Sequence, residues 1–153
     1  MPLLMTGVAA ERFVVLNLRI LAATFALVGL LFIALPDGTL GALDDFGDWL
    51  PLGEFSAAPD TAEQLWLALG FAYMTVITGI CLVVSLDVVR YRPLLLVLAA
   101  GKAASSLAAL GAYLFDTDVF AYLLNFLVDG FLVGVALLLY DVAGRVGEPA
   151  APS

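Results

Sequence analysis

"LLLVLAAGKAASSLAALGAYLF", residues 94–115, is an apolar stretch that carries a single charge, Lys102. A membrane-spanning helix needs about 20 consecutive apolar residues to cross a hydrocarbon core of roughly 30 Å, so this stretch predicts one span. Three further stretches meet the same criterion, at residues 13–35, 65–86 and 119–140. Because backbone polar groups find no water inside lipid, each span should be an α-helix. The sequence therefore predicts an all-α integral membrane protein.

The composition of the whole chain supports this class. Of the 153 residues, 63% are hydrophobic, and the mean hydropathy is +1.09, which exceeds what a soluble domain of this size hides in one core. A long loop (residues 36–64) and two short turns (87–93 and 116–118) join the spans. With so short a second turn, the last two spans must form an antiparallel hairpin. We expect one four-helix bundle over residues 1–153, with no separate soluble domain.

The positions of the arginines predict the orientation. Four of them lie near a terminus or in the turn between the second and third spans: Arg12, Arg90, Arg92 and Arg145. The other two connections contain no Lys or Arg, and basic residues near span ends stay on the cytoplasmic side. Both termini are therefore expected in the cytoplasm. The net charge of −8 lies mostly on the external loops, and without a cluster of basic residues we expect no nucleic-acid partner.

The long external loop contains a second helical pattern. Apolar residues recur at helical spacing, and aspartates occupy the other faces: Leu40, Leu43, Phe46, Trp49 or Leu50, against Asp44, Asp45 and Asp48. This pattern is typical of a short interfacial helix, with Trp49 as its anchor. The alternative is an irregular cap held by the prolines of the loop. The sequence alone does not decide between these two structures.

Helix starts also have sequence signals. Asp60 and Glu63 fit a capping box, which predicts that the second span begins near Thr61. Asp118 is placed to cap the fourth span, and Pro93 suits the first turn of the third.

The third span has small residues at every fourth position: Ala100, Ala104, Ala108 and Ala112. Such spacing lets two helix backbones approach closely within a membrane. It predicts that this span is central and packs against a neighbour along this stripe. Gly130 and Gly134 of the fourth span form a GxxxG pair, which would serve either the same bundle or a dimer.

The charge of Lys102 has a candidate partner at matching depth. Lys102 lies nine residues after Pro93, about 13 Å from the cytoplasmic end at 1.5 Å per residue, and Asp129 lies eleven residues before Tyr140, about 16 Å from the same end. Intramembrane charges mark functional sites unless they pair only for structure. Two interpretations stay open, namely an ion pair that sets helix register and a ligand or proton site.

Other polar residues share the helix faces of this pair, so we expect a polar intramembrane pocket. The candidate ligand-binding residues, drawn from all four spans, are Lys102, Asp129, Asn125, Tyr122, Ser106, Asn17 and Tyr73.

Familiar catalytic and metal signatures are lacking in the sequence. It contains no histidine, which excludes histidine–metal sites and Ser-His-Asp chemistry. Gly101-Lys102 is no P-loop, because the earlier glycine of that motif is Leu96 here. The single cysteine, Cys81, has no disulfide partner. We expect no catalytic residue, no metal and no cofactor.

Several stretches carry a resemblance to a known family. "LRILAATFALVG" (residues 18–29), "LPDG" (35–38), a Gly-rich second span and a polar residue in the third resemble the DoxX-like superfamily of small bacterial membrane proteins. "RYRPLLLVLAAGKAASSL" (90–107) and "YLLNFLVDG" (122–130) are similar to stretches of uncharacterised four-helix membrane proteins. The resemblance implies a bacterial inner-membrane protein. Most members have no known function, some are linked to quinone or thiol-redox systems, and one cysteine does not supply a dithiol.

Three functions remain open. The first is a binding or accessory protein whose pocket accepts a membrane lipid or a small amphipathic molecule. The second is an assembly subunit that docks other membrane proteins or a second copy of itself. The third is a membrane enzyme or proton-coupled transporter that uses Lys102 and Asp129, although four spans are few for a transporter unless it dimerises.

Overall fold

The computed structural model describes residues 7–50, 55–56 and 64–146. Within these ranges the chain forms six helices: α1 (Gly7–Ala34), α2 (Pro36–Trp49), α3 (Gln64–Leu86), α4 (Val88–Tyr91), α5 (Leu94–Phe115) and α6 (Phe120–Ala143). Helices α1, α5 and α6, and α3 over Leu67–Leu86, are long and apolar enough to cross a membrane. The all-α class is thus confirmed, and each predicted span corresponds to a helix that is long and apolar enough to cross a membrane. Helix α1 begins earlier than the predicted span, because the helix continues through the polar residues Glu11 and Arg12.

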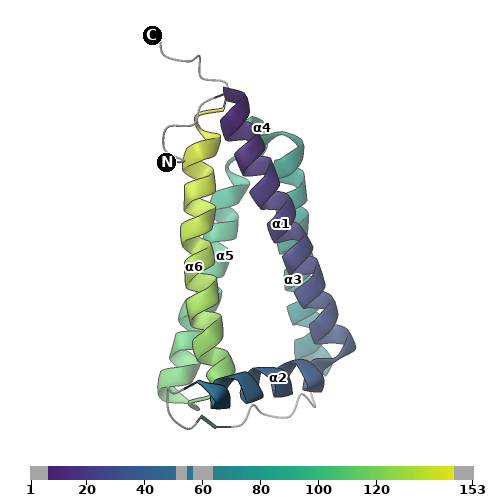
Figure 1. Cartoon of the computed structure of the whole chain (residues 1–153), viewed down its shortest axis with the longest axis vertical. Helices are drawn as coiled ribbons and strands as arrows, with labels where there is room; N and C mark the ends of the chain where they lie inside the picture. Colours follow the sequence, from purple (N-terminus) through teal and green to yellow (C-terminus); the bar gives the residue numbers. More distant parts are fainter. Residues whose placement is uncertain (1–6, 51–54, 57–63, 147–153) are drawn as a thin grey trace.

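The four long helices pack as two pairs. Helix α1 lies along α3, and α5 lies along α6, whereas contacts between the two pairs are far fewer. Figure 1 shows that the pairs meet at the end where α1 begins and α6 ends, and that they diverge toward the opposite end, where α2 crosses between them. The pairing of α5 with α6 follows from the short turn between them, as predicted.

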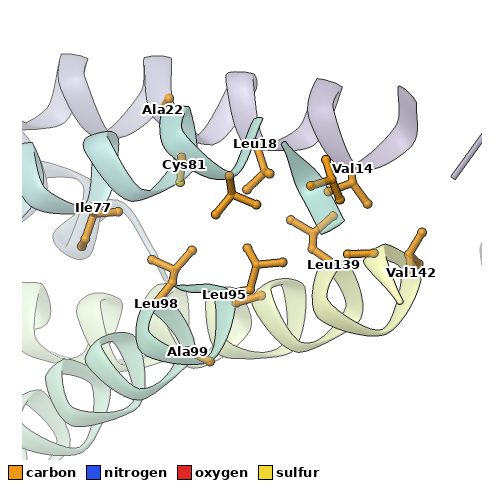
Figure 2. Close-up of a cluster of buried hydrophobic side chains, with 14 of the residues drawn as sticks. Val14, Leu18, Ala22, Ile77, Cys81, Leu95, Leu98, Ala99, Leu139 and Val142 are labelled. Carbon is orange, nitrogen blue, oxygen red and sulfur yellow. The ribbon is translucent and has the colours of Figure 1, made fainter. Parts of the chain in front are cut away.

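The apolar core lies where the two pairs meet. Val14 and Leu18 of α1 point toward Leu95 of α5 and toward Leu139 and Val142 of α6, and all five side chains are buried (Figure 2). The backbone N–H of Gly7 also donates a hydrogen bond to the carbonyl of Arg145 at 3.3 Å. The two helix pairs therefore pack together at the arginine-rich end of the molecule, which is its closed end.

Arg92, just before α5, fastens the last turns of α6 at this end. Its Nε donates to the carbonyl oxygen of Tyr140 at 2.9 Å, and its guanidinium lies 3.9 Å from the centre of the Tyr140 ring. The carbonyl groups at the end of a helix carry partial negative charge, so a cation there is stabilising.

Helix α2 confirms the predicted helix in the long loop and excludes the irregular alternative for Pro36–Trp49. The far end of α2 is fastened to α6 through Phe120. The Phe120 ring meets the rings of Phe46 and Phe55 edge-on, with centroid distances of 6.0 and 5.1 Å. Helix α2 therefore bridges the divergent ends of the two pairs.

The capping predictions had different outcomes. Asp118 does not cap α6: Val119 is the N-cap and makes no side-chain capping bond, while Asp118 accepts a hydrogen bond from the hydroxyl of Ser56. The carboxylate is thus used to hold the segment after α2. Pro93 does precede α5 directly. The capping box of Asp60 and Glu63 lies outside the described residues.

The prediction that α5 packs against a neighbour along its stripe of small residues is wrong. Ala100 and Ala104 are exposed, and it is Ala99, Ser106 and Ala109, beside the stripe, that are buried. The prediction failed because small residues occur around much of α5, so spacing alone did not identify the packed face.

Candidate functional site

Lys102 and Asp129 form the ion pair that their matched depths predicted. The Nζ of Lys102 lies 2.9 Å from Oδ1 of Asp129, and the two side chains are 1% and 6% exposed. The ammonium group also lies 4.6 Å from the ring centroid of Phe25 and 5.4 Å from that of Tyr73. Each of α1, α3, α5 and α6 contributes one of these four residues, so the group connects the two helix pairs.

This arrangement explains how a lysine is tolerated inside an apolar span. A buried charge is costly unless it is paired, and removing one partner of a buried pair costs about 3–5 kcal/mol. Aromatic faces add further attraction, about 2 kcal/mol or more for a desolvated cation. Lys102 therefore has one carboxylate and two rings that replace the water it has lost. Phe25 was not predicted from the sequence, because an aromatic residue in an apolar span gives no signal that it faces a cation.

Tyr73 contributes its ring to this group, whereas its hydroxyl makes no contact of this kind within the described chain. The hydroxyl oxygen is buried and has no hydrogen-bond partner among the described residues. A Cβ at Gly101 would lie 3.4 Å from that oxygen, so the absence of a side chain at Gly101 leaves room for Tyr73 against α5.

A cavity of about 610 Å³ lies between the two helix pairs on the side toward α2. Residues of α1, α2, α5 and α6 line it: Val28, Phe32, Leu40, Leu43, Ser105, Ala108, Ala109, Ala112, Ala121, Tyr122, Leu124, Asn125 and Val128. Only Ser105, Tyr122 and Asn125 carry polar side chains. The size is within the usual range of about 300–1,000 Å³ for ligand sites, and an apolar wall with a few polar groups is also typical of them.

The polar groups of the cavity wall lie on the facing sides of α5 and α6. Nδ2 of Asn125 donates to Oγ of Ser105 at 3.2 Å. Its Oδ1 and the hydroxyl of Tyr122 have no hydrogen-bond partner within the described part of the chain. One acceptor and one hydroxyl on neighbouring turns of α6 are therefore free for a ligand.

The predicted site residues divide into three groups. Tyr122 and Asn125 line the cavity, and Lys102, Asp129 and Tyr73 form the buried group about one helical turn away. The other two predicted residues donate to backbone carbonyls and are not among the lining residues of this cavity. Ser106 donates to the carbonyl of Phe126 at 2.8 Å, and Asn17 donates to the carbonyl of Phe13 at 2.8 Å within its own helix.

The structure therefore separates two features that the sequence suggested were one. The ion pair is enclosed by protein groups, and the open space has a neutral wall in which Ser105, which was not among the predicted site residues, takes the place of Ser106. Ser105 is the neighbour of Ser106 on α5, so a shift of one position along the helix separates the predicted serine from the one that lines the cavity. In the described ranges, no three or more Cys, Asp or Glu residues come together as a metal site.

Comparison with known proteins gives no relative. No protein-family model matches the chain, and no curated protein or solved structure shows significant similarity to it.

Proposed function

We propose that this chain is a multi-pass membrane protein that binds a lipid-like or other small amphipathic molecule in the cavity between its two helix pairs. The observation that carries the proposal is the cavity itself, whose apolar wall holds the unpaired polar groups of Tyr122 and Asn125. In this proposal the four spans form an N-in/C-in bundle in the bacterial inner membrane, and the acidic α2 lies on the external face. The resemblance to DoxX-like proteins belongs to the same proposal.

The ion pair has a supporting role in this function. Lys102 precedes the cavity residue Ser105 by three positions, and Asp129 follows Asn125 by four, so each lies about one turn from the wall. Because the pair joins α5 and α6 and also touches α1 and α3 through rings, it holds the closed half of the molecule together. The cavity lies beyond the ion pair, on the side where these contacts between the helix pairs end.

The test compares variants that fill the cavity with a matched variant outside it. Ala108→Phe and Ala112→Phe would place a ring in the space, whereas Leu107→Phe adds a ring at an exposed position of the same helix, away from the cavity. Each protein is purified in mild detergent, its folding is checked by circular dichroism, and its bound lipids are identified by mass spectrometry. We expect the wild type and Leu107→Phe to retain a molecule that both cavity variants lose. An identical lipid content in all four proteins would contradict the proposal.

A second candidate function is the docking of another membrane protein or of a second copy. It is favoured by the exposed small residues Ala100 and Ala104 on α5, where another helix has room to approach closely. Ala104→Phe should then change the oligomeric state or the co-purifying proteins in mild detergent, and it should leave the bound lipids unchanged. Ala112→Phe should have the opposite pair of effects if the cavity function is right.

A further inference from the structure

The wall of the cavity is electrically neutral. None of its lining residues is charged, and its polar groups are one amide, one phenol and one hydroxyl, from Asn125, Tyr122 and Ser105. About one turn beyond the wall on α5 and α6 lie Lys102 and Asp129, which cancel each other at 2.9 Å. A ligand in the cavity therefore meets hydrogen-bonding groups and no net charge.

The two free polar groups suit a small neutral head. Oδ1 of Asn125 accepts a hydrogen bond, and the Tyr122 hydroxyl donates or accepts one. A ligand hydroxyl would donate to Asn125 and bond to Tyr122, and a ligand carbonyl would accept from Tyr122. The rest of the wall, from Val28 and Phe32 to Leu40 and Leu43, offers only apolar surface.

Charged heads fit this space less well, for two different reasons. The end of the molecule near α2 is acidic, with Asp45, Asp48 and Asp116 exposed, and the sequence has no Lys or Arg between Arg19 and Arg90. An anionic head is therefore repelled from that end. A cationic head is attracted to it, but inside the cavity it would lose its water without finding a carboxylate.

We infer that the ligand is a neutral lipid, with an apolar body and one hydroxyl or carbonyl group held by Asn125 and Tyr122. This inference rests on the proposed function and specifies the chemical class of the molecule bound. It also assigns the two residues a selectivity role: they bind the head group, while the apolar wall binds the body.

The experiment uses three probes that share one hydrocarbon chain and differ in the head group. Protein in non-ionic detergent is equilibrated with equal amounts of hexadecanol, hexadecanoate and hexadecylamine, and the bound species are counted by native mass spectrometry. We expect the wild type to bind hexadecanol at least about tenfold more than either charged probe. Tyr122→Phe should lower hexadecanol binding about fivefold, as the loss of one hydrogen bond predicts. Tyr113→Phe, on α5 and outside the cavity wall, should not change it.

Asn125→Asp is the decisive variant, because it changes charge with little change in shape. It places a carboxylate in the neutral wall, so the preference should move from hexadecanol toward hexadecylamine. Equal binding of the three probes in the wild type, or a preference for a charged probe, would overturn the inference. If Ala112→Phe still abolished such binding, the proposed function would stand. Binding of no probe by the wild type, together with unchanged lipid content in the cavity variants, would overturn both.

Discussion

Gly47 of α2 lies so close to Phe120 of α6 that a Cβ on Gly47 would be 2.7 Å from Cγ and 2.9 Å from Cβ of the phenylalanine. Phe120 is itself buried, and its ring contacts the rings of Phe46 and Phe55. The contact includes the Cβ of Phe120, so a rotation of its ring alone would not relieve a clash. Helix α2 therefore packs against α6 through a position that requires a glycine for space.

The first prediction compares Gly47→Ala with Gly41→Ala. Both glycines lie within α2, where Ala normally stabilises a helix by about 0.5–1 kcal/mol relative to Gly. A Cβ at Gly41 meets nothing within 4 Å, so Gly41→Ala should raise the thermal unfolding temperature in detergent. Gly47→Ala should lower it, because the steric clash outweighs the helix propensity. Equal shifts in the two variants would show that α2 does not pack on Phe120.

The second prediction is a double-mutant cycle at the buried ion pair. Lys102→Met and Asp129→Leu should each destabilise the protein by about 3–5 kcal/mol, since each leaves an unpaired charge inside the protein. The double variant should recover much of this loss, because two apolar side chains of similar volume suit the site. Unfolding by a denaturing detergent measures the four free energies.

A matched control for this cycle is Leu107→Met, at an exposed position of the same helix, which should change stability little. Single variants as stable as the wild type would contradict a structural role for the pair. A double variant that is stable and yet loses its bound lipid would instead place the pair in the ligand site.

The third prediction concerns topology. Asp45→Cys and Ala151→Cys, each in a Cys81→Ala background, should react with a membrane-impermeant thiol reagent from opposite sides of the membrane. The physical reason is the one-sided distribution of arginine, which predicts cytoplasmic termini. Labelling of both positions from the same side would refute the four-span arrangement.

The fourth prediction concerns Trp49, which is 75% exposed at the end of α2 and stacks on Phe46 with a centroid distance of 5.9 Å. If α2 lies at the membrane surface, Trp49 should be at the level of the lipid head groups. In a Trp66→Phe background, its fluorescence should be quenched by lipids that are spin-labelled near the head group. Quenching by aqueous iodide alone would show that α2 is exposed to water.

Much of the fold could be predicted from local features of the sequence. Apolar length predicted the four long helices, and the spacing of Leu40, Leu43 and Phe46 offered α2 as one of two alternatives. The ion pair could also be predicted, because a short turn forces α5 and α6 together and sets Lys102 beside Asp129. These features depend on lengths and on neighbours along the chain.

What could not be predicted depends on contacts between elements distant in sequence. Nothing local indicates that α1 lies along α3, or that the ring of Phe25 faces Lys102. The spacing of the small residues around Ala104 did not identify the packed face of α5, because small residues fit equally well against another helix or against lipid. Asp118 has a residue type and position that suit a helix cap, yet its carboxylate accepts a hydrogen bond from Ser56 instead.

The divergence of the two helix pairs has a mechanical consequence. With its core at one end and α2 across the other, the molecule tapers along the direction of its long helices (Figure 1). If the long helices span a bilayer as proposed, such a wedge would displace more lipid from one leaflet than from the other. The elastic energy of the surrounding bilayer would then depend on the spontaneous curvature of its lipids and on lateral pressure. Lipids that favour curvature toward the narrow leaflet would accommodate this shape with the least elastic strain.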